Sequence, residues 1–114
     1  MLIRRVEDSD GKVTFQTIFP AAYSGRWPHI HFEVYESVAA AVGSGSKLKT
    51  SQIALPEDTC KLVYATTGYE QIVQNLAGTS LDGDNVFSDG YAGQLATTSG
   101  DVKRGITAKL NVGV

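Results

Sequence analysis

The sequence predicts an all-β sandwich with one or two short helices inserted after its central strands. Two observations lead to this prediction. Several segments alternate apolar and polar residues with the period of a β-strand, and short sequences rich in glycine, aspartate and serine separate them. At 114 residues the chain has an ordinary length for one domain, so we expect residues 1–114 to form a single domain with its own hydrophobic core.

The first strand signal follows the turn sequence Asp-Ser-Asp-Gly at residues 8–11. Residues 12–19 are rich in β-branched and aromatic side chains and predict a strand, which Pro20 ends. After a loop over 21–28, residues 29–35 alternate again and predict a second strand.

The middle of the chain changes character twice. Residues 36–46 predict a loop because their Gly-Ser-Gly-Ser sequence offers no side chains to pack, and residues 47–55 predict a third strand. Acidic residues follow Pro56 in what would be the first turn of a helix, so we expect a short helix over 56–64. A weaker apolar spacing predicts a second helix over 69–76.

The last third of the chain is read as turns followed by strands. Residues 77–90 are rich in turn sequences such as Asp-Gly. Two alternating runs, 91–98 and 102–114, are separated by Ser-Gly-Asp at 99–101, which predicts a hairpin with its turn at that point.

Composition excludes several classes of partner. The net charge is −2 and no stretch is strongly basic, which argues against nucleic acid or an anionic membrane surface. The longest run of small apolar residues, 38–42, is far too short to span a bilayer. The N-terminal residues lack the apolar core and cleavage site of a signal peptide; this fits a cytoplasmic protein or a secreted one after leader removal. The single cysteine, Cys60, excludes an internal disulfide, and we interpret it as a small buried residue.

The chemistry of the chain is concentrated around its two histidines. His29 and His31 lie two residues apart in a predicted strand, so both imidazoles point to the same face. Imidazole is a suitable ligand for iron, zinc and copper. Tyr23 lies six residues earlier, and its phenolate is a hard oxygen donor that suits a ferric ion. Arg26, always cationic, can stabilise negative charge on a substrate or on a bound phenolate.

A structural interpretation of these residues also stays open. The histidines fit half-buried strand positions with hydrogen-bonded rings, Tyr23 fits a loop aromatic packed on the sheet, and Arg26 fits a surface cation. We interpret Trp27 as a hydrophobic anchor. A cupin-like metal barrel is excluded because the chain has no third histidine.

Residues 11–35, GKVTFQTIFPAAYSGRWPHIHFEVY, resemble the core of the intradiol ring-cleavage dioxygenases, the family of catechol and protocatechuate dioxygenases. That family combines a strand with phenylalanine, threonine and isoleucine, a proline-containing turn with tyrosine, and then arginine, proline and histidine-x-histidine. Residues 50–53, TSQI, resemble the next family strand, in which a glutamine borders the active site. The resemblance implies an intradiol dioxygenase-type β-sandwich.

The resemblance also implies a site and a reaction. Tyr23, His29 and His31 would hold a non-haem Fe(3+) ion, Arg26 would face the substrate and stabilise a carbanion-like catecholate, and Gln52 would border the active site. The partners would be a small aromatic diol and O2. Ring opening between the two hydroxyl-bearing carbons would give a cis,cis-muconate-type diacid.

One departure from the family pattern keeps a second function open. The family uses two tyrosines and two histidines, but no tyrosine precedes Tyr23 here. We expect one of three explanations: the chain is a fragment, another residue or subunit fills the position, or oxygenase activity has been lost while the scaffold binds a metal or an aromatic ligand. A short N-terminal region would also expose a sheet edge, so we expect a homodimer as one outcome.

Overall fold

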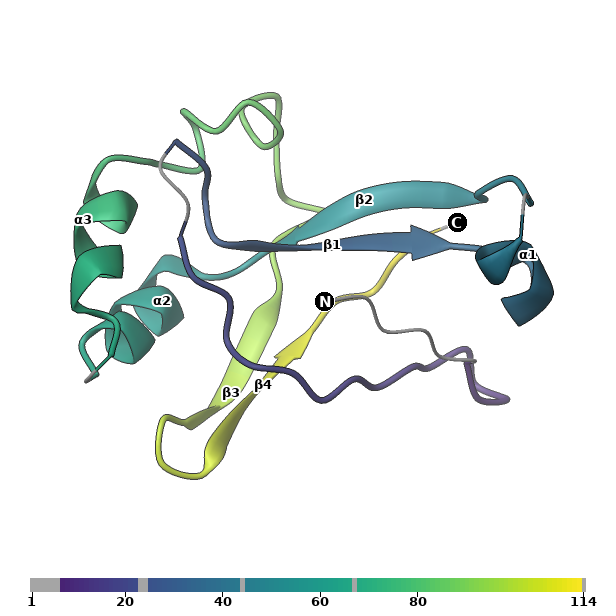
Figure 1. Ribbon diagram of the computed structural model, residues 1–114, viewed down its shortest axis with the longest axis horizontal. Helices are drawn as coiled ribbons and strands as arrows, with labels where there is room; N and C mark the ends of the chain where they lie inside the picture. The colour runs from purple at the N-terminus through teal and green to yellow at the C-terminus, as the bar shows by residue number, and fades with distance from the viewer. Residues whose placement is uncertain (1–6, 23–24, 44, 67, 114) are drawn as a thin grey trace.

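The computed structural model describes residues 7–22, 25–43, 45–66 and 68–113. Four strands and three helices occur in these ranges, and Figure 1 shows their arrangement. In chain order they are β1 (His29–Val34), α1 (Val38–Val42), β2 (Lys49–Ala54), α2 (Glu57–Tyr64), α3 (Glu70–Ala77), β3 (Thr97–Asp101) and β4 (Gly105–Lys109). No helix in the described ranges is long and apolar enough to cross a bilayer.

The predicted all-β sandwich is wrong. Strands β1 and β2 form one antiparallel two-stranded sheet, β3 and β4 form another, and three helices complete a small mixed fold (Figure 1). A sandwich needs two layers of several strands each. The described segments that alternate in sequence but pair with no strand, above all 12–19, leave both sheets too small to form such layers.

The first sheet confirms two predicted strands. β1 and β2 lie within the predicted ranges 29–35 and 47–55, and their register places His31 opposite Gln52 and His29 opposite Ala54. The predicted loop between them contains α1, which begins where the hydroxyl of Ser37 accepts a hydrogen bond from the Ala40 amide at 3.1 Å. The sequence does not predict this helix, because it has five residues and is followed directly by the glycine- and serine-rich residues 43–46.

The strand predicted over 12–19 is absent from the described structure. This segment runs beneath β1 in Figure 1 without regular secondary structure, and the side chains of Val13, Phe15 and Ile18 are exposed. Alternation of apolar and polar residues indicates a chain that can form a strand, but a strand also needs a partner for its backbone groups. No described strand pairs with this segment.

The end of this segment is held by side chains from α2 and the α3 region. The hydroxyl of Tyr64 donates to the carbonyl of Pro20 at 2.7 Å, and the amide of Asn75 donates to the carbonyl of Ala22 at 3.1 Å. Burial raises the pKa of the Tyr64 phenol, so it stays protonated and remains a donor. These bonds satisfy backbone acceptors that no strand satisfies, and they fix the chain just before the candidate site.

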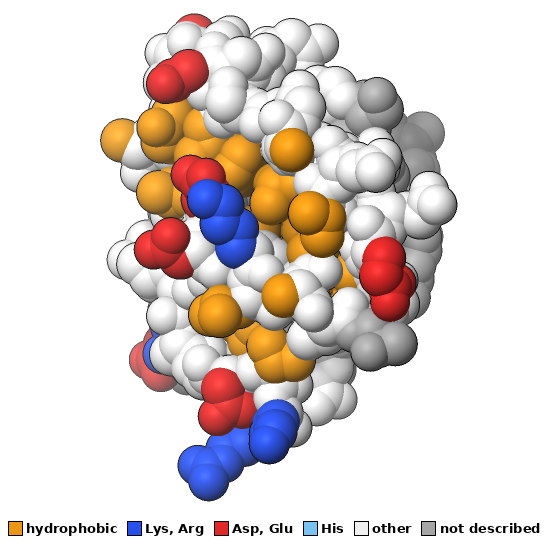
Figure 2. All heavy atoms as spheres, turned by 90° about the vertical axis from the view of Figure 1, so that its left-hand side faces the viewer, with side chains coloured by type: hydrophobic (Ala, Val, Ile, Leu, Met, Phe, Trp, Pro, Cys, Tyr) orange, Lys and Arg blue, Asp and Glu red, His pale blue; other side chains and the backbone are white. Residues whose placement is uncertain are grey.

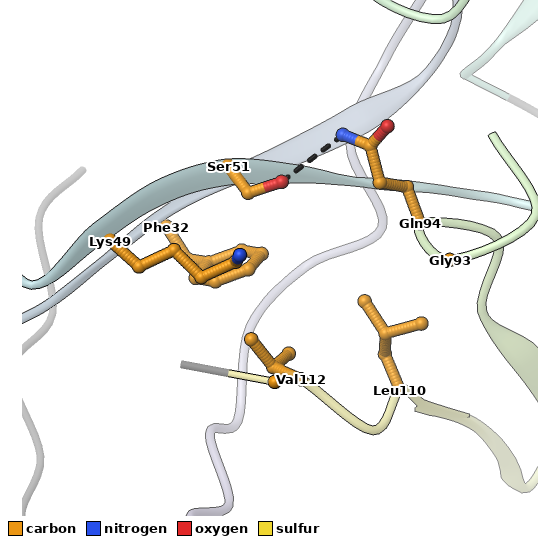
Figure 3. A pocket seen from close by; sticks show the side chains of 8 residues that line it. Phe32, Lys49, Ser51, Gly93, Gln94, Leu110 and Val112 are labelled. Carbon is orange, nitrogen blue, oxygen red and sulfur yellow. Dashed lines mark hydrogen bonds between the residues drawn. The ribbon is translucent and has the colours of Figure 1, made fainter. Parts of the chain in front are cut away.

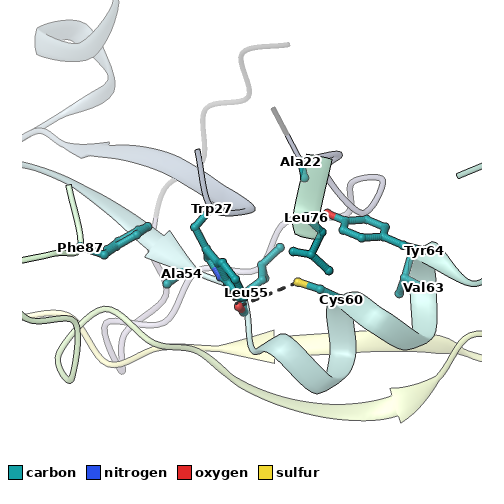
Figure 4. Packing of buried hydrophobic residues seen from close by; sticks show 9 residues of the cluster. All are labelled: Ala22, Trp27, Ala54, Leu55, Cys60, Val63, Tyr64, Leu76 and Phe87. Carbon is teal, nitrogen blue, oxygen red and sulfur yellow. Dashed lines mark hydrogen bonds between the residues drawn. The ribbon is translucent and has the colours of Figure 1, made fainter. Parts of the chain in front are cut away.

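Both predicted helices are confirmed, and their inner faces build the core. Figure 4 shows Trp27 and Leu55 packed beside Cys60 of α2 and Leu76 of α3. Trp27 is buried in this core, which confirms its predicted role as a hydrophobic anchor, and its indole donates to the carbonyl of Leu55 at 2.7 Å. Cys60 is fully buried as predicted, and burial raises the pKa of its thiol to about 12.

The outer faces of these helices are not uniformly polar. Figure 2 shows hydrophobic side chains gathered on the side of the molecule that carries α2 and α3. Leu62 of α2 and Val73 of α3 are exposed and contribute apolar surface, and an exposed ion pair between Glu57 and Lys61, at 2.9 Å, lies along α2. The helices therefore cover the core with one face and leave a mixed surface outside.

The C-terminal hairpin forms, but not where the sequence predicts it. Residues 99–101 lie within β3 instead of forming the turn, and the turn occupies 102–104. Gly100 has a φ of +93°, and a side chain there would overlap the carbonyl oxygen of Gly105 across the hairpin. Glycine at 100 thus permits close approach within the ladder, although its sequence context predicts a turn.

The run predicted as a strand over 91–98 is mostly irregular. Only its last two residues belong to β3, while Leu95 forms a single parallel bridge with Ala54 at the end of β2. The Ala54 amide donates to the Gln94 carbonyl at 2.8 Å, and the Ala96 amide donates to the Ala54 carbonyl at 3.0 Å. This short contact is what brings the second sheet beside the first.

Candidate functional site

The two histidines lie on one face of β1, as the strand period requires. His29 is partly buried at the start of the strand, and His31 is exposed two residues later. Gln52 of β2 stands directly opposite His31 in the ladder and shares its face. Glu33 continues this face and forms an exposed ion pair with Lys47 at 3.1 Å.

The ring of His29 is oriented by the backbone. Its Nδ1 lies 2.7 Å from the carbonyl oxygen of Trp27. A carbonyl oxygen only accepts hydrogen bonds, so Nδ1 carries the proton and, in the neutral ring, Nε2 carries the lone pair. A hydrogen bond of this kind, from one ring nitrogen to a backbone carbonyl, is one of the ways in which metal-ligating histidines are held.

A buried carboxylate organises the loop that precedes β1. Asp84 has no exposed side-chain surface, and it accepts hydrogen bonds from four donors. Its Oδ2 accepts from Nε of Arg26 and from the Trp27 amide, each at 2.7 Å; its Oδ1 accepts from the Val86 amide at 2.8 Å and the Phe87 amide at 3.3 Å.

The charge state of Asp84 follows from these contacts. Burial alone would raise the pKa of its carboxyl group, but the bonds from Arg26, Trp27 and Val86 together outweigh that effect and lower the pKa to about 2. Asp84 is therefore ionised at neutral pH, and its charge is balanced by the Arg26 guanidinium beside it.

The guanidinium of Arg26 bridges Asp84 and Gln52. Besides its bond to Asp84, it donates from Nη2 to Oε1 of Gln52 at 2.6 Å. Because Gln52 lies opposite His31, the arginine is fixed at the histidine-bearing face of the sheet. Two residues that the sequence could relate only through a family resemblance, Arg26 and Gln52, are thus in direct contact.

The predicted residues stand as follows. The structure brings Arg26 and Gln52 into contact and places Gln52 opposite His31. His29 lies on the same face, two residues before His31. Tyr23 lies outside the described residues, so its predicted part as a metal ligand stays a prediction. Among described side chains, no three of His, Cys, Asp and Glu gather as a metal site; the predicted set takes its third ligand from tyrosine instead.

Asp84 is the functional-site residue that sequence reasoning missed. It lies in the segment 77–90, which the sequence marks as turns, and turn aspartates are ordinarily exposed. Its neighbour Asp82 is exposed, as that reading expects, and nothing local distinguishes the two. Only the long-range contact with Arg26 does so.

No family model, no curated protein and no solved structure matches this chain. A function for it therefore depends on the chemistry of its own residues.

A cavity of about 420 Å³ adjoins Gly25, immediately before Arg26, and is lined by small residues of the segment 77–83. A space of this volume is in the range of small-molecule sites.

Replacing Asp84 by asparagine tests the organising role of the carboxylate. Asp84→Asn removes the charge that balances Arg26 and turns one acceptor into a donor, so we expect a loss of about 2 to 3 kcal/mol in unfolding free energy at pH 7. The measurement is urea denaturation, with Asp82→Asn as the exposed control in the same turn.

The pH dependence of this loss has a defined sign. The folded-state pKa of Asp84, about 2, lies below its ordinary value of 3.8, so its contribution is present above about pH 4 and disappears as the pH falls to about 2. The difference between wild type and Asp84→Asn should shrink over that interval. A difference equal to that of Asp82→Asn at pH 7 would contradict the role of Asp84.

Proposed function

We propose that this chain is an intradiol dioxygenase-like protein that holds non-haem ferric iron through Tyr23, His29 and His31. Its reaction is the cleavage of a catechol-type diol by O2 between the two hydroxyl-bearing carbons, which gives a cis,cis-muconate-type diacid. The observation that carries this proposal is the contact of Arg26 with Gln52, at 2.6 Å, opposite His31. The sequence resemblance over 11–35 supports it independently.

The residues present fit a ferric ion. His29 and His31 offer two imidazoles on one strand face, and because Nδ1 of His29 bonds to the Trp27 carbonyl, Nε2 would be the nitrogen that binds the ion. Tyr23 would supply an anionic oxygen donor, which matches the high charge of Fe(3+). When bound, the ion would supply the Lewis acidity and redox capacity that ring cleavage requires.

The part of Arg26 in this proposal is to hold negative charge on the substrate. Two of its five N–H groups donate to Asp84 and Gln52, and the other three make no hydrogen bond to any described residue. Its side chain is 24% exposed, so the guanidinium reaches the surface of the site. A planar cation fixed at two points offers its remaining donors in a set direction, which favours an oxyanion there.

Gln52 and Asp84 act as positioning residues. Asp84 fixes Nε of Arg26, and Gln52 fixes Nη2, so neither needs to touch the substrate to influence the reaction. Asp84 also offsets part of the arginine charge, which weakens the attraction of the guanidinium for anions in solution.

Homodimerisation stays a prediction. It would occur at the outer edge of β1, which pairs with no described strand.

A second function is supported by one feature of the sequence. The residues that match the family pattern include one of its two tyrosine ligands, Tyr23. A site with one phenolate would hold ferric iron less tightly than a site with two, which would suit a protein that binds a metal or an aromatic ligand without turnover. Oxygen uptake with catechol separates this binding protein from the enzyme.

His31→Ala tests the metal site. We expect wild type to bind one equivalent of ferric iron and to show the broad visible band of a tyrosinate–iron complex, and His31→Ala to lose both. The measurement is a ferric titration followed by absorption and metal analysis after desalting. Thr50→Ala, an exposed change on the same sheet face, is the control and should bind as wild type does. Equal binding by His31→Ala would remove this site.

Arg26→Lys tests the substrate role while keeping the positive charge. A lysine cannot bridge Asp84 and Gln52 with one planar group, so we expect iron to remain bound while turnover falls roughly 100-fold. The rate of catechol-dependent oxygen uptake measures this, and Arg104→Lys, exposed in the hairpin turn, is the control. Wild-type turnover in Arg26→Lys would show that the arginine does not act on the substrate.

A further inference from the structure

A second hollow lies on the opposite face of the first sheet. Because successive residues of a strand alternate sides, Phe32, Lys49 and Ser51 face away from the histidines. They border a cavity of about 350 Å³, and Figure 3 shows Gln94, Leu110 and Val112 lining its other side. The two candidate sites thus share a sheet but no side chain.

The cavity has an apolar wall. The Phe32 ring lies across from Leu110 and Val112 in Figure 3, so the middle of the space is lined by an aromatic ring and two branched aliphatic side chains. Surfaces of this kind favour a flat or branched hydrocarbon body. A volume of about 350 Å³ holds a single ring and leaves room for a polar substituent.

Two polar side chains that line the cavity can donate to a ligand, Ser51 and Lys49. The amide of Gln94 donates to the Ser51 hydroxyl at 3.1 Å and to the Gln52 carbonyl at 3.2 Å. Since the Ser51 oxygen already accepts a hydrogen bond, its own proton is left to donate. Lys49, which also lines the cavity, adds an ammonium group, which has donors only.

Lys49 has no acidic partner in the described structure. The nearby Lys47 pairs with Glu33 at 3.1 Å, and Lys61 pairs with Glu57 at 2.9 Å, but no described residue forms an ion pair with Lys49. No Asp or Glu lines the cavity among the described residues. A partly buried cation with an apolar wall beside it and no counter-charge is chemically suited to an anionic ligand.

We propose that this cavity binds a small carboxylate with an aromatic or branched apolar body. The carboxylate would pair with Lys49 and accept from the Ser51 hydroxyl, and the apolar body would lie between Phe32 and Leu110. This site does not depend on iron or on the proposed reaction, because none of its side chains belongs to the histidine face.

Binding of benzoate to the full chain, with metal removed by a chelator, tests the proposal. We expect saturable binding by calorimetry, at least about tenfold weaker binding of the neutral analogue benzamide, and the same loss for benzoate in Lys49→Met. Lys47→Met is the matched control, since Lys47 lies two residues away and is paired with Glu33; it should bind benzoate as wild type does. Leu110→Ala should weaken benzoate binding by removing one apolar wall.

The position of the ligand is read from backbone amide shifts in NMR spectra. Changes centred on Gly93, Leu110 and the Ser51 amide support the cavity. No saturable binding, equal affinity in Lys49→Met, or shifts confined to residues around His31 would each overturn the proposal. Failure of the iron titration leaves this result unaffected, so the two sites are tested separately.

Discussion

The candidate site depends on one partly buried ionic interaction, that of Asp84 with Arg26. A carboxylate with no exposed surface is costly to bury, and here four donors compensate it, one of them the Arg26 guanidinium. The same bonds join three parts of the chain: the loop before β1, the turn at 84–87 and, through Arg26, strand β2. Among the described residues, Asp84 is the one that forms an ion pair with Arg26.

The first sheet then divides the chemistry of the molecule between its two faces. One face presents His29 and His31, with Gln52 and the tethered Arg26 beside them. The other presents Phe32, Lys49 and Ser51 to a cavity that the C-terminal segment also lines. A ladder of two short strands is marginally stable alone, so the core around Trp27 and Leu55 and the bridge at Ala54 must hold it in place.

Local signals predicted local structure well, and long-range structure poorly. β1, β2, α2 and α3 follow from periodicity and from acidic residues at a helix start, which depend on neighbours in sequence. The prediction of a sandwich was wrong because a strand at 12–19 needs a partner strand, and alternation in the sequence does not supply one. The predicted position of the hairpin turn was wrong because Gly100 lies within the ladder, where it allows the two strands to approach closely. Asp84 was missed because burial of a turn aspartate is decided by a residue 58 positions away.

Oxygen consumption by the ferric-loaded full chain with catechol, coupled to identification of the product, tests the proposed function most directly. We expect one O2 consumed for each cis,cis-muconate formed, with ring opening between the hydroxyl-bearing carbons. Iron retained by the protein with no oxygen uptake above that of free ferric iron would contradict an enzymatic function and leave a protein that binds metal without turnover.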